Sequence, residues 1–245
     1  MNWTVGIGMI GVMALGGISP ALIDRAVENS LKQNFGPFKK LEVRSKTDFM
    51  SLLNGKVDGL SVKAGDFQVD GLPVQRMDIQ TGAMRFDTWG ALRGQARWLN
   101  EIEATASGAL DEPALNSLIA RPFVQNQLKN IKVNLPMAET AAIENLAIAV
   151  IENRIELKGN IDIGNGFPLP FRLSGAPLVL DHRLFIRDVD LQVMGMTLAP
   201  ALYQEALRKP LEMPVISNLR YRLDSLEPRQ GRLEFRGSLW LSAVK

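Results

Sequence analysis

Side chains suited to acid–base or metal chemistry are few in this sequence. Its 245 residues include one histidine, His182, and no cysteine, which excludes thiolate catalysis and cysteine-bound zinc. His182 follows Asp181 in residues 180–184, a segment typical of a tight turn between strands. A solvated turn residue is the simpler interpretation, and a hydrolase that uses Asp181 and His182 is the minority hypothesis.

The sequence also lacks the common motifs of enzymes. The sequence has no nucleophile elbow, phosphate-binding loop or metalloprotease motif. Carboxylates such as Glu156 and Asp162 fall in the polar phase of predicted strands, which is typical of a solvated surface. The 28 Lys and Arg against 26 Asp and Glu give a net charge of +2, so no strong field favours nucleic acid. We therefore expect a protein that is not an enzyme, needs no cofactor or metal and binds no nucleic acid.

The N-terminal segment 1–23 has no charged side chain and includes five glycines. It is long enough to span a bilayer, but it lacks the Lys or Arg that a secretory signal or signal anchor normally carries ahead of its apolar part. Three interpretations stay open: a membrane anchor or uncleaved signal, a membrane-dipping arm, and a buried helix. We predict an apolar segment 1–19, a single domain 20–245 and membrane contact through 1–23.

Helical periodicity predicts a few helices that could cover a sheet. The first starts at Pro20 and ends before Gly36, with an apolar stripe that includes Leu22, Val27 and Leu31. A second starts after Asp111 as N-cap, and Pro122 breaks it before a further helix. A short helix is expected over 199–208. Residues 39–46 are basic and predict a solvated strand edge or, alternatively, a contact with anionic lipid headgroups.

Alternating segments predict strands over 41–46, 56–87, 146–194 and 219–243. A hairpin turn is expected at 70–71 and another at 228–231. Gly82 shifts the apolar phase as a β-bulge would, and residues 176–177 are expected to break the third group of strands. The order of elements and the absence of a Pro-, Gly- or Ser-rich linker favour one α+β domain.

Two strands repeat one phrase. RIELKGNI at 154–161 returns as RLEFRGSL at 232–239. In both, apolar residues hold one phase and charged residues the other, so each is expected to be a half-buried strand with its charges in water. The central glycines permit a bend, a bulge or a close approach by another group.

The predicted fold is α+β, with a long curved antiparallel sheet wrapped against the N-terminal amphipathic helix and short helices. The sheet and helices could enclose an ordinary core or leave an apolar groove for an acyl lipid. The candidate lipid-binding residues are Leu22, Val27, Leu31, Leu115, Leu118, Phe123, Ile155, Leu157, Ile161, Leu233, Phe235 and Leu239.

Several segments in this order resemble the LmeA-like phospholipid-binding family of bacteria. They are GISPALIDRA at 17–26, LNGKVDGL at 53–60, GLPV at 71–74, GALDEPALNSL at 108–118 and GRLEFRG at 231–237. The resemblance implies a non-enzymatic lipid-binding protein of the cell envelope, on its periplasmic side, with an architecture similar to tubular lipid-binding domains. Its expected partners are a phospholipid or other acyl lipid and a membrane surface. A membrane-anchored structural or assembly module without ligand is the alternative.

Overall fold

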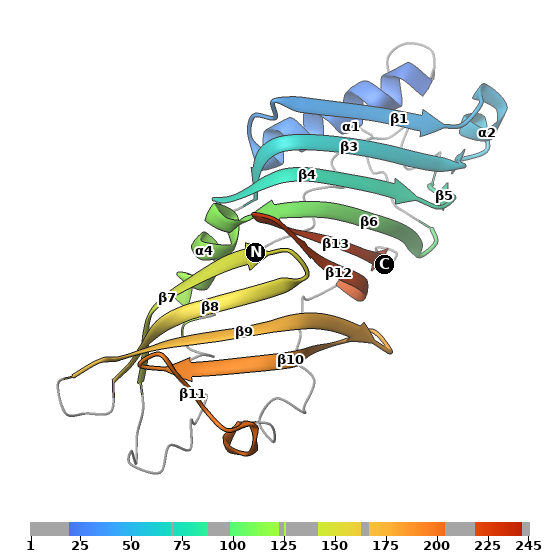
Figure 1. The fold of residues 1–245 in the computed structure, drawn as a ribbon. Helices are drawn as coiled ribbons and strands as arrows, with labels where there is room; N and C mark the ends of the chain where they lie inside the picture. The colour runs from blue at the N-terminus through green and yellow to red at the C-terminus, as the bar shows by residue number, and fades with distance from the viewer. Residues whose placement is uncertain are drawn as a thin grey trace. The chain divides into compact units, whose positions relative to one another are not determined.

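The structure, a computed structural model, describes residues 20–69, 71–87, 99–122, 125, 142–162, 167–203 and 219–241 (Figure 1). The elements in chain order are α1 (Pro20–Phe35), β1 (Lys40–Lys46), α2 (Phe49–Leu53), β2 (Lys56–Val57), β3 (Gly59–Val69), β4 (Leu72–Thr81), β5 (Met84–Arg85), β6 (Ile102–Asp111), α4 (Glu112–Ile119), β7 (Ala142–Ile151), β8 (Arg154–Asp162), β9 (Leu169–Leu180), β10 (Arg183–Val193), β11 (Met196–Thr197), the 3-10 helix η2 (Pro200–Leu202), β12 (Leu219–Arg229) and β13 (Arg232–Leu241). Antiparallel strands with few short helices are consistent with the predicted α+β class.

The strands that the structure describes form three sheets. Six strands lie in the order β1-β3-β4-β6-β13-β12, five lie in the order β11-β10-β9-β8-β7, and β2 pairs with β5. The chain divides into two compact units, one of residues 1–109, 214–222 and 236–245, the other of residues 110–213 and 223–235. The β12–β13 hairpin thus contributes residues to both. The single domain expected over 20–245 stays a prediction.

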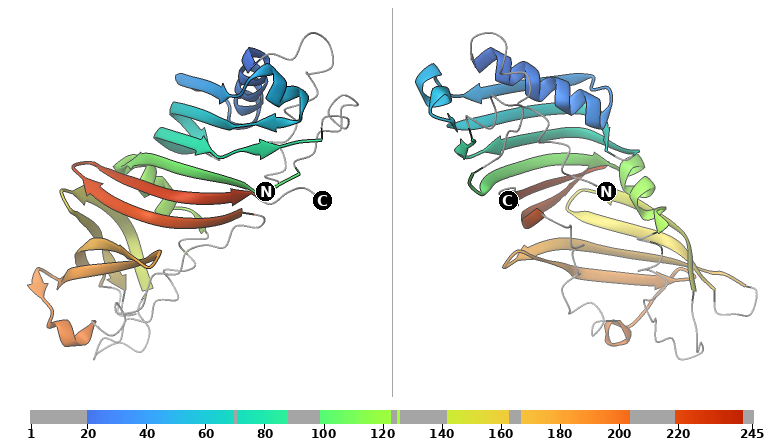
Figure 2. Two further views of the ribbon diagram at one scale, coloured as in Figure 1. Left: turned by 90° about the vertical axis from the view of Figure 1, so that its right-hand side faces the viewer. Right: turned by 180° about the vertical axis from the view of Figure 1, so that it is seen from behind.

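In the first unit, α1 packs on β1 and β3 (Figure 2). Ile23 and Val27 of the helix are buried in one core cluster with Val43 of β1 and Val62 of β3. The backbone N–H of Ser45 also donates to Asp24 Oδ1 over 2.6 Å. The predicted helix 20–35 therefore forms, and its apolar stripe helps to close the core of this unit.

The hairpin expected at 70–71 is present, because β3 and β4 pair antiparallel and Gly71 adopts φ 75°. The bulge expected at Gly82 is wrong. Here β4 ends at Thr81, and the chain continues into β5, which pairs with β2. The phase shift in the sequence therefore marks a change of sheet.

In the second unit, β7 to β11 form the five-stranded sheet. The break expected at residues 176–177 is wrong: Pro177 lies within β9, opposite Ile186 of β10. Proline is tolerated there because β8 pairs with β9 only as far as Gly175, so no ladder on that side needs its N–H. The irregularity is on β10, where the register shifts at Asp188, with φ 52°.

The helix start expected at Asp111 is present, whereas the helices expected after Pro122 and over 199–208 are described only in part. Asp111 caps α4, since the Ala114 N–H donates to its Oδ1 over 2.9 Å. The short helix expected from 199 begins as η2, and its predicted continuation from 204 lies outside the described residues, as does most of the helix expected after Pro122. No described helix has the length and apolar character needed to cross a membrane; residues 1–19 are not among those described.

A candidate lipid-binding surface

The two copies of the repeated phrase lie in different sheets. RIELKGNI forms β8 of the five-stranded sheet, and RLEFRGSL forms β13 of the six-stranded sheet. Their first apolar residues nevertheless belong to one cluster, in which Ile155 and Leu233 pack with Leu115 of α4 and Val150 of β7. The two copies of the phrase are thus not paired strands. Each contributes apolar side chains to the same cluster.

Helix α4 is fixed to the free edge of β7. The side-chain amide of Asn116 bonds both backbone groups of Ile148, accepting from its N–H over 2.8 Å and donating to its carbonyl over 2.9 Å. Glu112 Oε1 accepts from the Val150 N–H over 2.7 Å, and the Gly231 N–H donates to the Val150 carbonyl over 2.8 Å. These bonds satisfy an edge strand that would otherwise expose a backbone ladder.

One face of the five-stranded sheet carries apolar side chains from four neighbouring strands. Its central row consists of Ile148, Leu157, Leu173 and Leu191, which are opposite one another in register and all half-buried. We call this surface the apolar wall. Its members are Ile143, Leu146, Ile148, Val150, Ile155, Leu157, Ile161, Leu169, Phe171, Leu173, Leu191 and Val193.

A glycine leaves room for the aromatic member of the wall, Phe171. Gly159 is opposite Phe171 in register. A Cβ at position 159 would lie 2.9 Å from Phe171 Cε1, 2.9 Å from the Glu144 carbonyl oxygen and 3.0 Å from Leu146 Cδ2. Such contacts are too short, so of the roles predicted for this glycine the close approach is the one observed. The bulge is on β7 beside it, where Asn145 has φ 54°.

The wall is large enough for an acyl chain. At about 3.3 Å per residue, Ile155 to Ile161 spans roughly 20 Å, and four strands about 4.8 Å apart span roughly 14 Å. One leaflet of a bilayer has a hydrocarbon thickness of about 15 Å. The end of the wall at Val150 is covered by Leu115, whereas the row through Leu157 and Leu173 stays half-buried.

The opposite face of the same sheet is polar, as expected, but Glu156 is not in water. Only 2% of its surface is exposed, because Lys158 (Nζ–Oε1 2.7 Å) and the Arg172 guanidinium lie over its carboxylate. The expectation that this charge faces solvent is wrong because the long cationic side chains themselves cover it. Burial alone would raise the pKa of Glu156, but the bonds to Lys158 and Arg172 outweigh it and lower that pKa.

A similar arrangement explains the aromatic residue that interrupts the polar phase of β13. The Arg222 guanidinium lies 5.4 Å from the centre of the Trp240 ring, a cation–π distance. Arg222 Nη2 also approaches Ser238 Oγ at 3.4 Å, and Ser238 is buried. In the first unit, Ser238 and Trp240, which alternate with the apolar residues of β13, are therefore packed against Arg222 of β12 and are not fully in water.

The structure separates the candidate lipid-binding residues into groups. Leu115, Ile155 and Leu233 share one cluster, and Leu157 and Ile161 belong to another on the apolar wall. Val27 and Leu31 pack in the core of the first unit. Leu118, Phe235 and Leu239 are half-buried and are not members of these clusters. Leu22 lies in α1 but its side chain is not among those described, and Phe123 lies outside the described residues. The role of all twelve candidate residues in lipid binding stays a prediction.

Sequence reasoning missed the part of the wall on β9 and β10, where Leu169, Phe171, Leu173, Leu191 and Val193 lie. The signal was present, because apolar residues alternate with Pro, Arg and Ser over 169–174 and with Asp and Gln over 189–193. The repeated phrase at 154–161 marks only β8.

Two hollows are lined by described residues, and charged side chains contribute to the lining of both. The larger, of about 470 Å³, lies in the second unit beside the β7–β8 turn, and its charged lining residues are Glu152, Arg154, Arg187, Asp188, Glu227 and Arg229. The smaller, of about 310 Å³, lies in the first unit over β1 and β3. Neither is the apolar tunnel that a fully enclosed lipid requires.

His182 occupies the turn between β9 and β10, where it and Asp181 both have positive φ, 62° and 48°. Its side chain is 53% exposed and its Nδ1 lies 3.5 Å from Asp224 Oδ1. The carboxylate near the imidazole is thus Asp224 rather than the expected Asp181. Among the residues that the structure describes, no three acidic or histidine side chains gather as a metal site would require.

Comparison with known proteins agrees with the resemblance found in the sequence. The model of the LmeA-like phospholipid-binding family matches residues 16–238, nearly the whole chain. This chain belongs to that family. Searches among curated proteins and among solved structures gave no match. Membership favours a binding role over catalysis and a phospholipid as the partner.

Proposed function

We propose that this protein binds a phospholipid non-enzymatically and holds its acyl chains against the apolar wall of the five-stranded sheet. The observation that carries the proposal is the half-buried row Ile148, Leu157, Leu173 and Leu191. Leucines in a closed core are normally buried fully, whereas an apolar ligand surface must keep area available for its ligand. Family membership supports the same partner.

The energetic demand explains why a wide wall is needed. Withdrawing a chain of about sixteen methylenes from a bilayer forfeits roughly 13 kcal/mol, at about 0.8 kcal/mol per methylene. A carrier must offset most of this by contact with apolar side chains along the whole chain. Apolar side chains lie in rows across four strands, and Phe171 lies over Gly159. Together they supply a continuous apolar surface of this kind.

We further propose that the protein works at a membrane of the cell envelope, with residues 1–23 as one contact. Family membership and the uncharged character of that segment support this placement. The wrapping of a curved sheet around an amphipathic helix, as in tubular lipid-binding domains, also stays a prediction.

The test replaces one leucine of the central row and measures phospholipid uptake. Leu173→Gln places an amide where an acyl chain would lie, and an unsatisfied polar group costs about 1–3 kcal/mol. Uptake of a fluorescent phospholipid from vesicles should therefore weaken about 5- to 150-fold. Leu180→Gln is the matched control, because Leu180 is an exposed residue of β9 in the opposite phase.

Circular dichroism of both variants shows whether the fold is retained, and Leu157→Gln in the same row replaces Leu173→Gln if that variant unfolds. Equal uptake by the folded Leu173→Gln variant and the control contradicts the proposed surface. Absence of any uptake by the unaltered protein favours the alternative, a membrane-anchored structural or assembly module without ligand.

A further inference from the structure

Helix α2 presents an apolar patch to solvent in the first unit. Phe49, Met50 and Leu53 are 52%, 64% and 44% exposed. Because residues three and four apart are neighbours on a helix, the three side chains form one contiguous patch. We call it the α2 patch. Contiguous apolar surface of this kind on a protein usually marks an interaction site.

The patch is held by a well-packed base. Leu52 of the same helix is fully buried, with 0% exposure, in a cluster that includes Val57 of β2. Asp48 caps the helix, since its Oδ1 accepts from the Ser51 N–H over 2.7 Å. Thr47 Oγ1 further donates to the Lys56 carbonyl over 3.2 Å, which joins the segments before and after the helix. The outward direction of the patch is therefore fixed by the fold.

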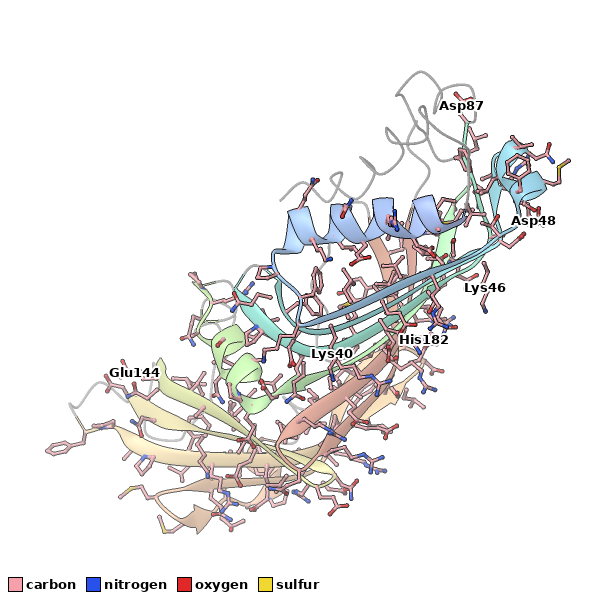
Figure 3. The ribbon with its side chains drawn as sticks, turned by 90° about the horizontal axis from the view of Figure 1, so that it is seen from above. Lys40, Lys46, Asp48, Asp87, Glu144 and His182 are labelled. Atoms are coloured by element: carbon pink, nitrogen blue, oxygen red, sulfur yellow. The ribbon has the colours of Figure 1, made fainter. Side chains whose placement is uncertain are left out.

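A basic hollow lies over β1, the strand that precedes α2, and its neighbour β3. It has a volume of about 310 Å³, and its lining residues are Glu42, Arg44, Ser45, Lys46, Ser61 and Lys63. Arg44, Lys46 and Lys63 lie on β1 and β3, where Arg44 is opposite Ser61 in register. Figure 3 shows Lys46 and Asp48 close together where β1 ends and α2 begins. Of the residues that line the hollow, Lys46 is thus the nearest in the chain to the α2 patch, three residues before Phe49.

Two carboxylates near this hollow form ion pairs within the chain, and Asp48 accepts hydrogen bonds from Ser51. Glu42 pairs with Arg44 (Oε1–Nε 2.5 Å) and Asp58 with Lys56 (Oδ1–Nζ 2.5 Å). Lys46 and Lys63 have no carboxylate partner among the described residues. In the lining of the hollow itself the three cations Arg44, Lys46 and Lys63 outnumber the one carboxylate, Glu42, so the charge of the hollow is positive.

We propose that this end of the first unit docks on an anionic lipid bilayer. The α2 patch enters the interfacial region, and Lys46 and Lys63 bind lipid phosphates in or beside the hollow. A bilayer offers an apolar interior and a layer of phosphate in one plane, and the α2 patch and the basic hollow match these two features. This contact is separate from residues 1–23 and from the apolar wall, so it does not depend on a lipid being carried.

The absence of cysteine in the chain allows a local probe in the full-length protein. Met50→Cys carries an environment-sensitive fluorophore, and Met194→Cys, at an exposed methionine of the second unit, is the control. With phosphatidylcholine vesicles containing phosphatidylglycerol, the label at 50 should brighten, shift to the blue and be quenched by spin-labelled lipids. The label at 194 should not respond.

Two lysine substitutions test the charge contribution. The double variant Lys46→Gln with Lys63→Gln removes two positive charges. Its affinity for anionic vesicles should fall about 30-fold. The control, Arg183→Gln with Arg187→Gln, changes the net charge equally on β10 of the second unit. Phe49→Ser with Leu53→Ser should also abolish the response of the label at 50 while the fold is retained.

Three outcomes overturn the proposal. These are no binding to anionic vesicles, binding with a silent label at 50, and equal weakening by the lysine and arginine pairs. If the label at 50 stays silent on vesicles but responds to a purified protein partner, the patch is a protein interface. Lipid uptake at the apolar wall is a separate readout, so failure here leaves the proposed function intact.

Discussion

Gly159→Ala tests whether the apolar wall depends on close packing over β8. The added Cβ would lie 2.9 Å from both Phe171 Cε1 and the Glu144 carbonyl oxygen, and the backbone oxygen has little freedom to move. Overpacking of this kind costs about 1–3 kcal/mol. Removing a glycine from the unfolded chain returns about 0.4–1 kcal/mol. The free energy of unfolding should therefore fall by about 1–2 kcal/mol, measured by urea unfolding with circular dichroism.

Gly65→Ala is the matched control, because it is a strand glycine whose added Cβ would have no neighbour closer than 3.5 Å. Its free energy of unfolding should stay unchanged or rise. Adding Phe171→Leu to Gly159→Ala should cost less than the two changes separately, since a shorter side chain relieves one contact. A Gly159→Ala protein as stable as the unaltered chain, or strict additivity with Phe171→Leu, would refute this packing.

Two further changes test single interactions. Glu156 has a lowered pKa in the folded protein, so its ion pairs stabilise the fold above the unfolded value of about 4.3 and this contribution is lost as pH falls through the lowered pKa. Glu156→Gln should lower the free energy of unfolding at pH 7 by about 1–3 kcal/mol and much less at pH 3; an equal loss at both pH values contradicts the pairing. Asp111→Ala removes the cap that accepts from the Ala114 N–H and should cost about 1 kcal/mol, whereas Asp111→Asn retains a capping oxygen and should cost little; equal unfolding midpoints in urea would show that the cap is unimportant.

Much of the local structure follows from short-range signals. The hairpin at Gly71 and the start of α4 at Asp111 depend on a few neighbouring residues, and both are present. The shift at Gly82 and the proline at 177 carry equally local signals, but their meaning depends on which strands lie beside them. No pattern within one strand contains that information.

The candidate site shows the same limit. Alternation identified the apolar face of β8, but register determines that Leu157 meets Leu173 and that Phe171 lies over Gly159. Glu156 was expected in water because its phase is polar, and its burial follows from a cation on the neighbouring strand, Arg172. Pairing across strands, which periodicity does not encode, therefore decided both the position of the wall and the environment of the charge.

The most direct test of the central claim is photo-crosslinking with a phospholipid whose acyl chain carries a photoactivatable group, followed by peptide mass spectrometry of the full-length protein. We expect adducts on peptides of β8, β9 and β10 that contain Leu157, Leu173 and Leu191. Leu173→Gln should reduce these adducts and Leu180→Gln should not. Adducts confined to the α2 patch or to residues 1–23, or no specific adducts at all, would contradict lipid binding on the apolar wall.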